Sequence, residues 1–203
     1  IEKDTELSKT LRLKYSNNIN LKIYNNDILK FDIEKIIKKK SIIFGNLPYN
    51  ISSQILVKFI KFNKWPLKFS DIIFMFQKEL GEKIIGKYKS EHYSRLSILT
   101  AYRLDISKKF LVTPNCFFPK PKVTSMVIHL KPKNIISYKI KNIANLEKIT
   151  NIIFSNKRKM INKNLRKVLS DNKIKKIPNL NLNSRPTEIQ SNIYYKITEL
   201  YEN

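Results

Sequence analysis

Apolar positions between residues 41 and 76 follow two alternating patterns. Continuous apolar runs at residues 41–44 and 71–76 are typical of strands buried on both faces of a sheet. Between these runs, apolar residues recur at helical spacing, at Ile51, Ile55, Leu56, Phe59 and Ile60. A helix is therefore predicted here, with Ser52 or Ser53 available as its N-cap.

Shorter patterns flank this unit. Residues 1–4 resemble the end of a strand, and residues 5–15 have the spacing of a helix. Further strands are predicted at 21–24 and at 124–131, and the last of these suits the antiparallel end of a sheet. The alternation of strands and helices predicts an α/β fold with a parallel sheet.

A change of pattern after Pro132 predicts a domain boundary, because a polar stretch follows this proline. Residues 146–169 and 187–201 look helical, and no strand pattern lies near them. We therefore predict an α/β domain over residues 1–133 and a small, basic, all-helical domain over residues 134–203.

The charge of the chain indicates what kind of partner it binds. The 203 residues include 40 Lys and Arg against 16 Asp and Glu, a formal net charge of +24. Such an excess favours polyanions and predicts a nucleic-acid partner. A genome rich in A and T is the alternative explanation, since Ile and Asn are also abundant.

Composition also restricts the compartment. Cys116 is the only cysteine, so no disulfide can form within the chain. The apolar runs are far shorter than the roughly 20 residues of a membrane helix, and the start IEKDTELSKT does not resemble a signal peptide. A soluble, cytoplasmic monomer is expected.

Glycine is scarce, with only Gly45, Gly81 and Gly86 in the chain. No glycine-rich loop joins a strand to a helix, so the usual backbone cradle for a nucleotide-like cofactor is missing. We therefore expect the natural protein to have an additional N-terminal βα unit.

Two acids follow predicted strands. Ligands of open α/β sheets bind at the carboxyl ends of the strands, where Glu2 and Asp27 are expected. Glu2 can accept hydrogen bonds from ribose hydroxyls, and Asp27 can accept one from an adenine amino group. Each acid can equally be a helix cap or a solvent-facing charge.

The segment Asn46-Leu47-Pro48-Tyr49 combines acceptors with an aromatic face. The side-chain oxygen of Asn46 and the carbonyl of Leu47 can accept both N–H bonds of an adenine amine, which makes its nitrogen a better nucleophile. Pro48 restricts the backbone, and Tyr49 offers a stacking face for an unpaired base. The alternative is an ordinary strand end, turn and core tyrosine.

A second aromatic cluster, FFPKPKV, begins at Phe117 and includes Lys120 and Lys122. Aromatic and basic residues in a proline-stiffened loop suit RNA, although the cluster read alone favours a basic loop with core aromatics. Cys116 is interpreted as a passive buried thiol, because no base lies near it in the sequence.

The histidines His92 and His129 are isolated, so both are interpreted as structural and no metal site is predicted. Basic residues gather on an amphipathic stretch whose predicted apolar side holds Met160, Ile161, Leu165 and Val168. They are Lys157, Arg158, Lys159, Lys163 and Arg166. They form either an RNA-backbone surface or a solvated helix face.

Taken together, the motifs resemble the small-subunit ribosomal RNA adenine N6-dimethyltransferases. In chain order they are IEKD, NDILKFD, FGNLPYNISSQIL, FMFQKEL, YSRLS, FFPKPKV and FSNKRKMINKNL. The resemblance implies a Rossmann-like methyltransferase domain, without the family's glycine-rich first motif, followed by an all-helical domain. It also implies S-adenosylmethionine as cofactor and the small ribosomal subunit and its rRNA as partners.

The resemblance assigns roles to single residues. It implies that Glu2 holds the cofactor ribose and Asp27 the cofactor adenine. Asn46 and Leu47 would hold the target amine, next to the cofactor, while Tyr49 and Phe117 would stack on the two faces of the target base. The implied reaction gives dimethyladenine at two adjacent adenines near the 3′ end of 16S-type rRNA.

Two other functions remain open. A large-subunit rRNA adenine methyltransferase of the macrolide-resistance type shares the N-[IL]-P-Y and F-x-P-x-P-K-V patterns. A non-catalytic RNA-binding assembly or transcription factor of the same fold would explain the missing glycine-rich loop. The intact Asn46-Leu47-Pro48-Tyr49 segment favours an enzyme.

Overall fold

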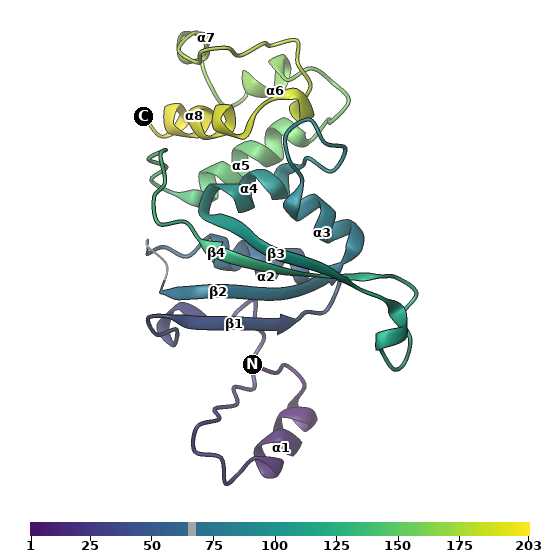
Figure 1. Cartoon of the computed structure of the whole chain (residues 1–203). Helices are drawn as coiled ribbons and strands as arrows, with labels where there is room; N and C mark the ends of the chain where they lie inside the picture. The colour runs from purple at the N-terminus through teal and green to yellow at the C-terminus, as the bar shows by residue number, and fades with distance from the viewer. Residues whose placement is uncertain (65–67) are drawn as a thin grey trace.

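The computed structural model describes residues 1–64 and 68–203, and its centre is a mixed β-sheet (Figure 1). The strands of this sheet are β1 (Ser41–Asn46), β2 (Phe69–Gln77), β4 (Ser125–Pro132) and β3 (Leu104–Val112), in that spatial order. β1 and β2 are parallel, whereas β4 is antiparallel to both β2 and β3. The antiparallel end predicted for the sheet is confirmed.

Three helices lie against one face of the sheet: α2 (Ser52–Ile60), α3 (Lys78–Ile85) and α4 (Arg95–Arg103). The helical spacing of the apolar residues of α2 explains this arrangement, because it directs one stripe of the helix to the core. Phe59 of α2 packs on Phe74 and Phe69 of β2, with ring centroids 5.6 and 6.0 Å apart. All three rings are at most 2% exposed.

The opposite face of β1 is open, which corrects the prediction that both apolar runs are buried on both sides. Ile42 and Phe44 point to this face and are 54% and 72% exposed. Successive side chains of a strand point to opposite faces, and α2, α3 and α4 cover only one of them. A continuous apolar run therefore did not distinguish a half-covered strand from a fully buried one.

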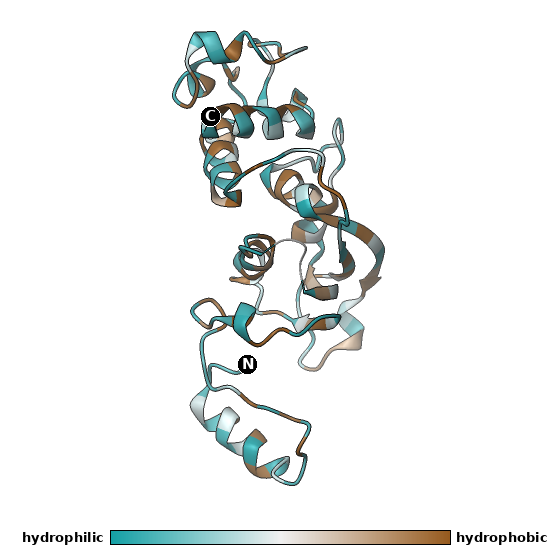
Figure 2. Cartoon of the chain, turned by 90° about the vertical axis from the view of Figure 1, so that its left-hand side faces the viewer, coloured by the Kyte–Doolittle hydropathy of each residue, from teal (hydrophilic) through white to brown (hydrophobic). Residues whose placement is uncertain are grey.

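The N-terminal segment protrudes from one end of the elongated molecule, and the C-terminal helices form the other end (Figure 2). The N-terminal segment contains α1 (Thr5–Lys14), which confirms the predicted helix. Asp4 is the N-cap of α1, and its side chain accepts a hydrogen bond from the Leu7 N–H at 2.8 Å. The strand predicted at 21–24 is wrong. Only an isolated parallel bridge between Glu2 and Asn25 forms there, so neither segment has the ladder of a strand.

The helical region after Pro132 is confirmed, but its first predicted helix is interrupted. α5 (Ile143–Phe154) ends long before Leu169, and a turn separates it from the short α6 (Asn162–Leu165). The remaining helices are α7 (Asp171–Ile174) and α8 (Ser191–Glu202), the second of which follows a 3₁₀ turn at Pro186–Glu188. The division at 133 and 134 stays a prediction.

The C-terminal helices are held on α4 and α2 by both apolar and polar contacts. Tyr195 of α8 donates a hydrogen bond to the Ile98 carbonyl at 3.0 Å and lies against Tyr102, with ring centroids 5.0 Å apart. Lys61, at the end of α2, forms an ion pair with Glu147 of α5 at 2.7 Å. Within residues 1–64 and 68–203, no helix is both long and apolar enough to cross a membrane.

The predicted serine cap of α2 is wrong. Ile51 occupies the N-cap position, and the Ser52 hydroxyl instead donates to the Tyr49 carbonyl at 3.0 Å. Ser52 is fully buried, so its hydroxyl finds its partner in the preceding turn. The sequence patterns also missed α4, as well as β3 and α3, in which charged residues interrupt the apolar ones.

Phe59 and Phe44 provide a matched test of the one-sided core. We expect Phe59→Ala to lower the free energy of unfolding by about 3–5 kcal/mol, because it leaves a cavity among buried rings. Phe44→Ala should change it by only about 0.5 kcal/mol, because that ring is mostly in solvent. Urea unfolding followed by circular dichroism measures both, and equal losses would contradict a core on one face only.

Candidate active site

Glu2 and Asp27 are brought together by a short parallel pairing of two chain segments. The Glu2 N–H donates to the Tyr24 carbonyl, and the Asn26 N–H donates to the Glu2 carbonyl, both at 2.9 Å. The Asn25 side chain adds hydrogen bonds to the carbonyls of Glu2 and Lys3. The two acids that sequence analysis selected therefore lie on adjacent segments, although neither ends a regular strand.

Asp27 is held as a carboxylate. Its side chain forms an ion pair with Lys3 at 2.9 Å and accepts the Leu29 N–H at 2.9 Å. The Lys3 contact, followed by the Leu29 N–H, lowers the pKa of Asp27 below its ordinary value. Asp27 is thus an ionised acceptor at neutral pH, with lone pairs left for a ligand.

Asn46 is the last residue of β1, and the backbone before it packs unusually closely. A Cβ atom at Gly45 would lie 2.5 Å from Leu47 Cδ2 and 2.9 Å from Phe74 Cδ1. Only glycine fits there without displacing a neighbour. This close packing sets the position of Leu47, whereas the Asn46 side chain remains exposed.

Tyr49 is anchored to a distant part of the chain. Its hydroxyl and that of Ser125 form a hydrogen bond of 2.8 Å, and Ser125 is fully buried at the start of β4. The adjacent Thr124 carbonyl accepts the Lys78 N–H at 2.9 Å. Since the loop that carries Phe117 ends at Thr124, the turn containing Tyr49 and the base of this loop are fixed side by side.

A cavity of about 450 Å³ is lined by most of the residues predicted to bind the cofactor or act in catalysis. Its lining includes Glu2, Asp27, Asn46, Leu47 and Pro48, together with apolar side chains. This volume lies in the range of small-molecule sites. The structure thus joins the two acids to the first three residues of the Asn46-Leu47-Pro48-Tyr49 segment, while Tyr49 and Phe117 are outside this lining.

The donor and acceptor chemistry of this cavity fits S-adenosylmethionine. Carboxylates suit ribose hydroxyls and an adenine amino group, and Ile28 and Phe44 provide apolar walls for a purine ring. Among residues 1–64 and 68–203, no group of three His, Cys, Asp or Glu side chains is placed to hold a metal ion.

The 113–124 loop carries the second predicted cluster. Phe117 is half-buried, whereas Lys120 and Lys122 are exposed. Cys116 is exposed too, which corrects the interpretation of a buried thiol. It belongs to the 3₁₀ turn Pro114–Cys116 on the surface of the loop, where the Thr113 hydroxyl lies 3.7 Å from its sulfur.

The basic residues of the helical region do not share one helix face as predicted. Lys157, Arg158 and Lys159 lie in the exposed turn after α5, Lys163 is in α6 and Arg166 follows it. Arg166 pairs with Asp171 and donates to Asn162 at 2.8 Å. Of the predicted apolar side, Ile161 and Leu165 are buried, but Met160 is 58% exposed because the chain is turning there.

Sequence analysis missed the side chains that support these residues. Lys3 pairs with Asp27 across 24 positions, and Ser125 pairs with Tyr49 across 76. No local pattern links residues so far apart. His129, interpreted as structural, forms a hydrogen bond of 2.6 Å with Asp71 of the neighbouring strand, and this contact agrees with that role.

Comparison with solved structures supports the class of protein that this fold and cavity define. A dimethyladenosine transferase from Plasmodium falciparum matches 96% of the chain and 78% of its own chain, at 26% identity and a TM-score of 0.69. The 23S rRNA methyltransferase ErmE matches all of the chain and 80% of its own, at 20% identity and a TM-score of 0.64, and shows the fold alone. The chain therefore has the Rossmann-like fold of the α/β methyltransferases.

Sequence comparison identifies the family. The family model for ribosomal RNA adenine dimethylase matches residues 1–203, so the chain belongs to this family of enzymes. Ribosomal RNA small subunit methyltransferase A of Pelagibacter ubique is 39% identical over the whole chain, which spans 76% of that protein. The protein of the same name from Francisella tularensis subsp. novicida is 43% identical over 155 residues, which span 58% of its length.

The ion pair of Asp27 predicts a dependence of stability on pH. Because the pKa of Asp27 is lowered in the folded state, its contribution is present at neutral pH and is lost as the pH falls through that lowered pKa. Asp27→Asn should therefore be less stable than the parent at pH 7. The difference should shrink as the pH falls below the ordinary pKa of 3.8 and disappear below the lowered pKa of the folded state.

Urea unfolding at a series of pH values measures this effect. Lys3→Met, which removes the partner cation, should show the same convergence with the parent at low pH. A stability difference that stays constant across the titration would contradict the electrostatic role of the pair.

Proposed function

We propose that the protein transfers methyl groups from S-adenosylmethionine to N6 of adenine in small-subunit ribosomal RNA. Repetition on two adjacent adenines near the 3′ end of a 16S-type RNA would give dimethyladenine. The main support is one cavity that contains Glu2 and Asp27 together with Asn46, Leu47 and Pro48. The same cavity thus offers acceptors for the cofactor and for the target amine.

Asn46 and Leu47 act on the target nitrogen. The lone pair of an adenine amine is delocalised into the ring, so the amine is a weak nucleophile. Acceptors on both N–H bonds favour a pyramidal nitrogen with its lone pair free to attack, and they stabilise the positive charge that develops there. Pro48 restricts the Leu47 backbone to extended conformations, which holds the second acceptor in place.

Tyr49 and Phe117 position the target base. The hydrogen bond between the hydroxyls of Tyr49 and Ser125 restricts the tyrosine ring, and the same contact anchors the base of the loop that carries Phe117. An adenine turned out of its helix would stack between the two rings. This orientation holds the amine beside Asn46 in the geometry needed for reaction, so the chemical step is effectively unimolecular.

Glu2 and Asp27 bind the methyl donor. Glu2 would accept the ribose hydroxyls, and the ionised Asp27 would accept the adenine amino group. S-adenosylmethionine supplies the electrophilic methyl group when it is bound. The residues of this chain contribute the orientation of both reactants and the stabilisation of the developing positive charge.

Two exposed basic groups would contact the RNA backbone. Lys120 and Lys122 lie beside Phe117, and the second group follows α5 in the helical region. Its members are Lys157, Arg158, Lys159, Lys163 and Arg166. We assign the second group to an rRNA-binding domain over residues 134–203, acting in a monomer that recognises the small ribosomal subunit.

The large-subunit alternative is less well supported. Its structural representative, ErmE, is only 20% identical, which is a likeness of fold. The relatives that share 39% and 43% identity are both small-subunit methyltransferases by name. Mapping of the methylated nucleotides separates the two functions, and label confined to the large subunit would overturn our assignment.

Asn46→Ala tests the catalytic role directly. We expect methylation of small subunits to fall by about a hundredfold or more, because the variant lacks one acceptor for the reacting amine. RNA affinity should be unchanged. Incorporation of labelled methyl groups and a filter-binding assay measure the two quantities.

The matched control is Asn50→Ala, which removes an equally exposed amide four residues away and should retain activity. Full methylation by Asn46→Ala would refute the role of Asn46. If neither the parent nor the control methylates RNA but both bind it, the RNA-binding assembly factor becomes the better assignment.

The basic turn after α5 predicts a measurable salt effect. Exchange of Lys157, Arg158 and Lys159 for Gln should weaken RNA binding and make it less dependent on salt. The slope of log binding constant against log salt concentration should fall in magnitude by up to about 0.9 for each phosphate that the variant no longer neutralises. The control exchanges the exposed residues Lys38, Lys39 and Lys40 and removes the same charge. Equal effects of the two triple variants would indicate only a general effect of net charge.

A further inference from the structure

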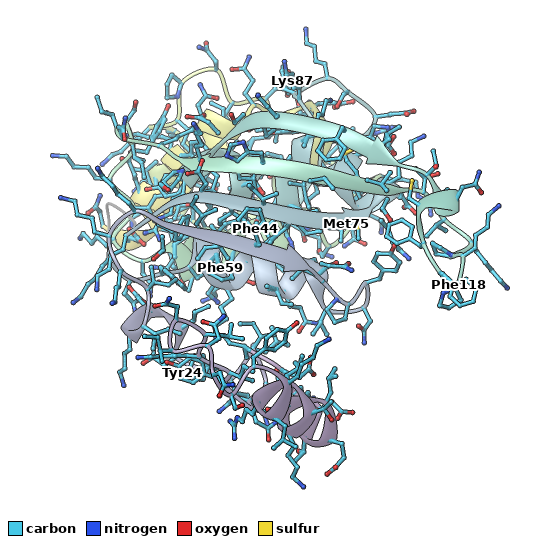
Figure 3. The ribbon with its side chains drawn as sticks, turned by 60° about the horizontal axis from the view of Figure 1, so that its bottom comes forward. Tyr24, Phe44, Phe59, Met75, Lys87 and Phe118 are labelled. Atoms are coloured by element: carbon cyan, nitrogen blue, oxygen red, sulfur yellow. The ribbon has the colours of Figure 1, made fainter. Side chains whose placement is uncertain are left out.

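Phe118 is the most exposed aromatic side chain among the described residues. It is 102% exposed, so the protein around it leaves its ring uncovered. Figure 3 shows it at the far end of the 113–124 loop, pointing away from the sheet and from the helices. Its neighbour Phe117 is half-buried, so the two rings of the Phe-Phe pair have different environments.

The loop that carries Phe118 is firmly held at its base. Val112 pairs with Ser125 where the strands β3 and β4 meet, and Ser125 bonds to Tyr49. Within the loop, the Phe117 N–H donates to the Pro114 carbonyl at 3.2 Å. Phe118 is seven residues from Ser125. Even if the intervening chain were fully extended, the two residues would be no more than about 25 Å apart, so Phe118 lies near the residue that anchors Tyr49.

The surroundings of Phe118 are positively charged. The hairpin from Ile106 to Leu130 contains four lysines and no Asp or Glu. They are Lys108, Lys109, Lys120 and Lys122, and all four are exposed. Exposed aromatic rings interleaved with cations are the surface that single-stranded nucleic acids bind, because bases stack on the rings while cations contact phosphates.

An apolar protein partner fits this surface less well. The exposed apolar residues Phe110 and Leu111 are consecutive in β3, so they point to opposite faces of the strand and do not extend one patch around Phe118. A single protruding ring among lysines matches one base with its phosphates. It does not match the broad apolar core of a protein interface.

We propose that Phe118 stacks on an unpaired base of the RNA substrate that neighbours the target adenine. This inference rests on the proposed function and adds a second base-binding position to it. Phe118 is a binding residue that fixes the RNA strand relative to the target. It is distinct from Phe117, which is assigned to the target itself.

Variants of Phe118 distinguish stacking from simple apolar contact. Phe118→Ala and Phe118→Leu should weaken binding of small subunits, and of a single-stranded oligoadenylate of about ten nucleotides, by roughly fivefold to a hundredfold. Phe118→Tyr should bind like the parent, because it keeps the ring. The control Ile135→Ala removes a side chain that is 83% exposed in another part of the chain and should have no effect.

A fluorescent reporter supplies an independent readout. The chain has a single tryptophan, Trp65, so Phe118→Trp combined with Trp65→Phe places the only indole at the loop tip. Titration with the oligoadenylate should quench this fluorescence if the base stacks on the ring. In steady-state methylation by the protein, Phe118→Ala should raise KM with little change in kcat, because the stacking contact is equally strong in the substrate complex and in the transition state.

Two outcomes would overturn the inference: parent-like RNA affinity of Phe118→Ala, or equal affinity of Phe118→Leu and the parent. The second would replace stacking by a non-aromatic contact. Neither outcome touches the proposed function, since methylation by the parent and its loss in Asn46→Ala are measured separately. A failure of that function would leave the binding assays with oligoadenylate fully interpretable.

Discussion

The absence of a side chain at Gly45 is the constraint on which both the core and the candidate active site depend. Phe74 occupies the space beside Gly45, and it packs in turn on Phe59 of α2 with ring centroids 5.6 Å apart. Leu47 fills the other side of the same position. The backbone that carries Asn46 and Leu47 is therefore held by the packing of buried aromatic rings.

The two halves of the cavity are supported very differently. The half at Asn46 and Leu47 is fixed by buried rings, whereas the half at Glu2 and Asp27 depends on one parallel bridge and on an ion pair whose Lys3 side chain is 77% exposed. Exposed ion pairs contribute little to stability. Elements with few buried contacts open at low free energy. The half at Asn46 and Leu47 is thus preformed, and the half at Glu2 and Asp27 is the part that a bound ligand would order.

Sequence reasoning succeeded where a pattern was long and local. β1, β2, α2 and β4 were predicted because apolar residues within each segment report the core directly. The C-terminal end of α5 was not predicted, because apolar residues near Met160 keep a helical spacing although the backbone turns there. The same limit applies to the site. Asn46-Leu47-Pro48-Tyr49 is visible as a motif, but the burial of Ser125 and its bond to Tyr49 arise only from strand pairing.

The open face of β1 has a consequence for the behaviour of the protein in solution. Ile42 and Phe44 present apolar area to water, and a second copy of the chain can cover it. The formal charge of +24 opposes such an encounter through long-range repulsion. Added salt screens that repulsion over about 8 Å at physiological ionic strength and leaves the apolar attraction intact. Colloidal stability therefore depends on the same ionic strength that governs the hold on RNA, so the salt that releases the polyanion also exposes the free protein to self-association.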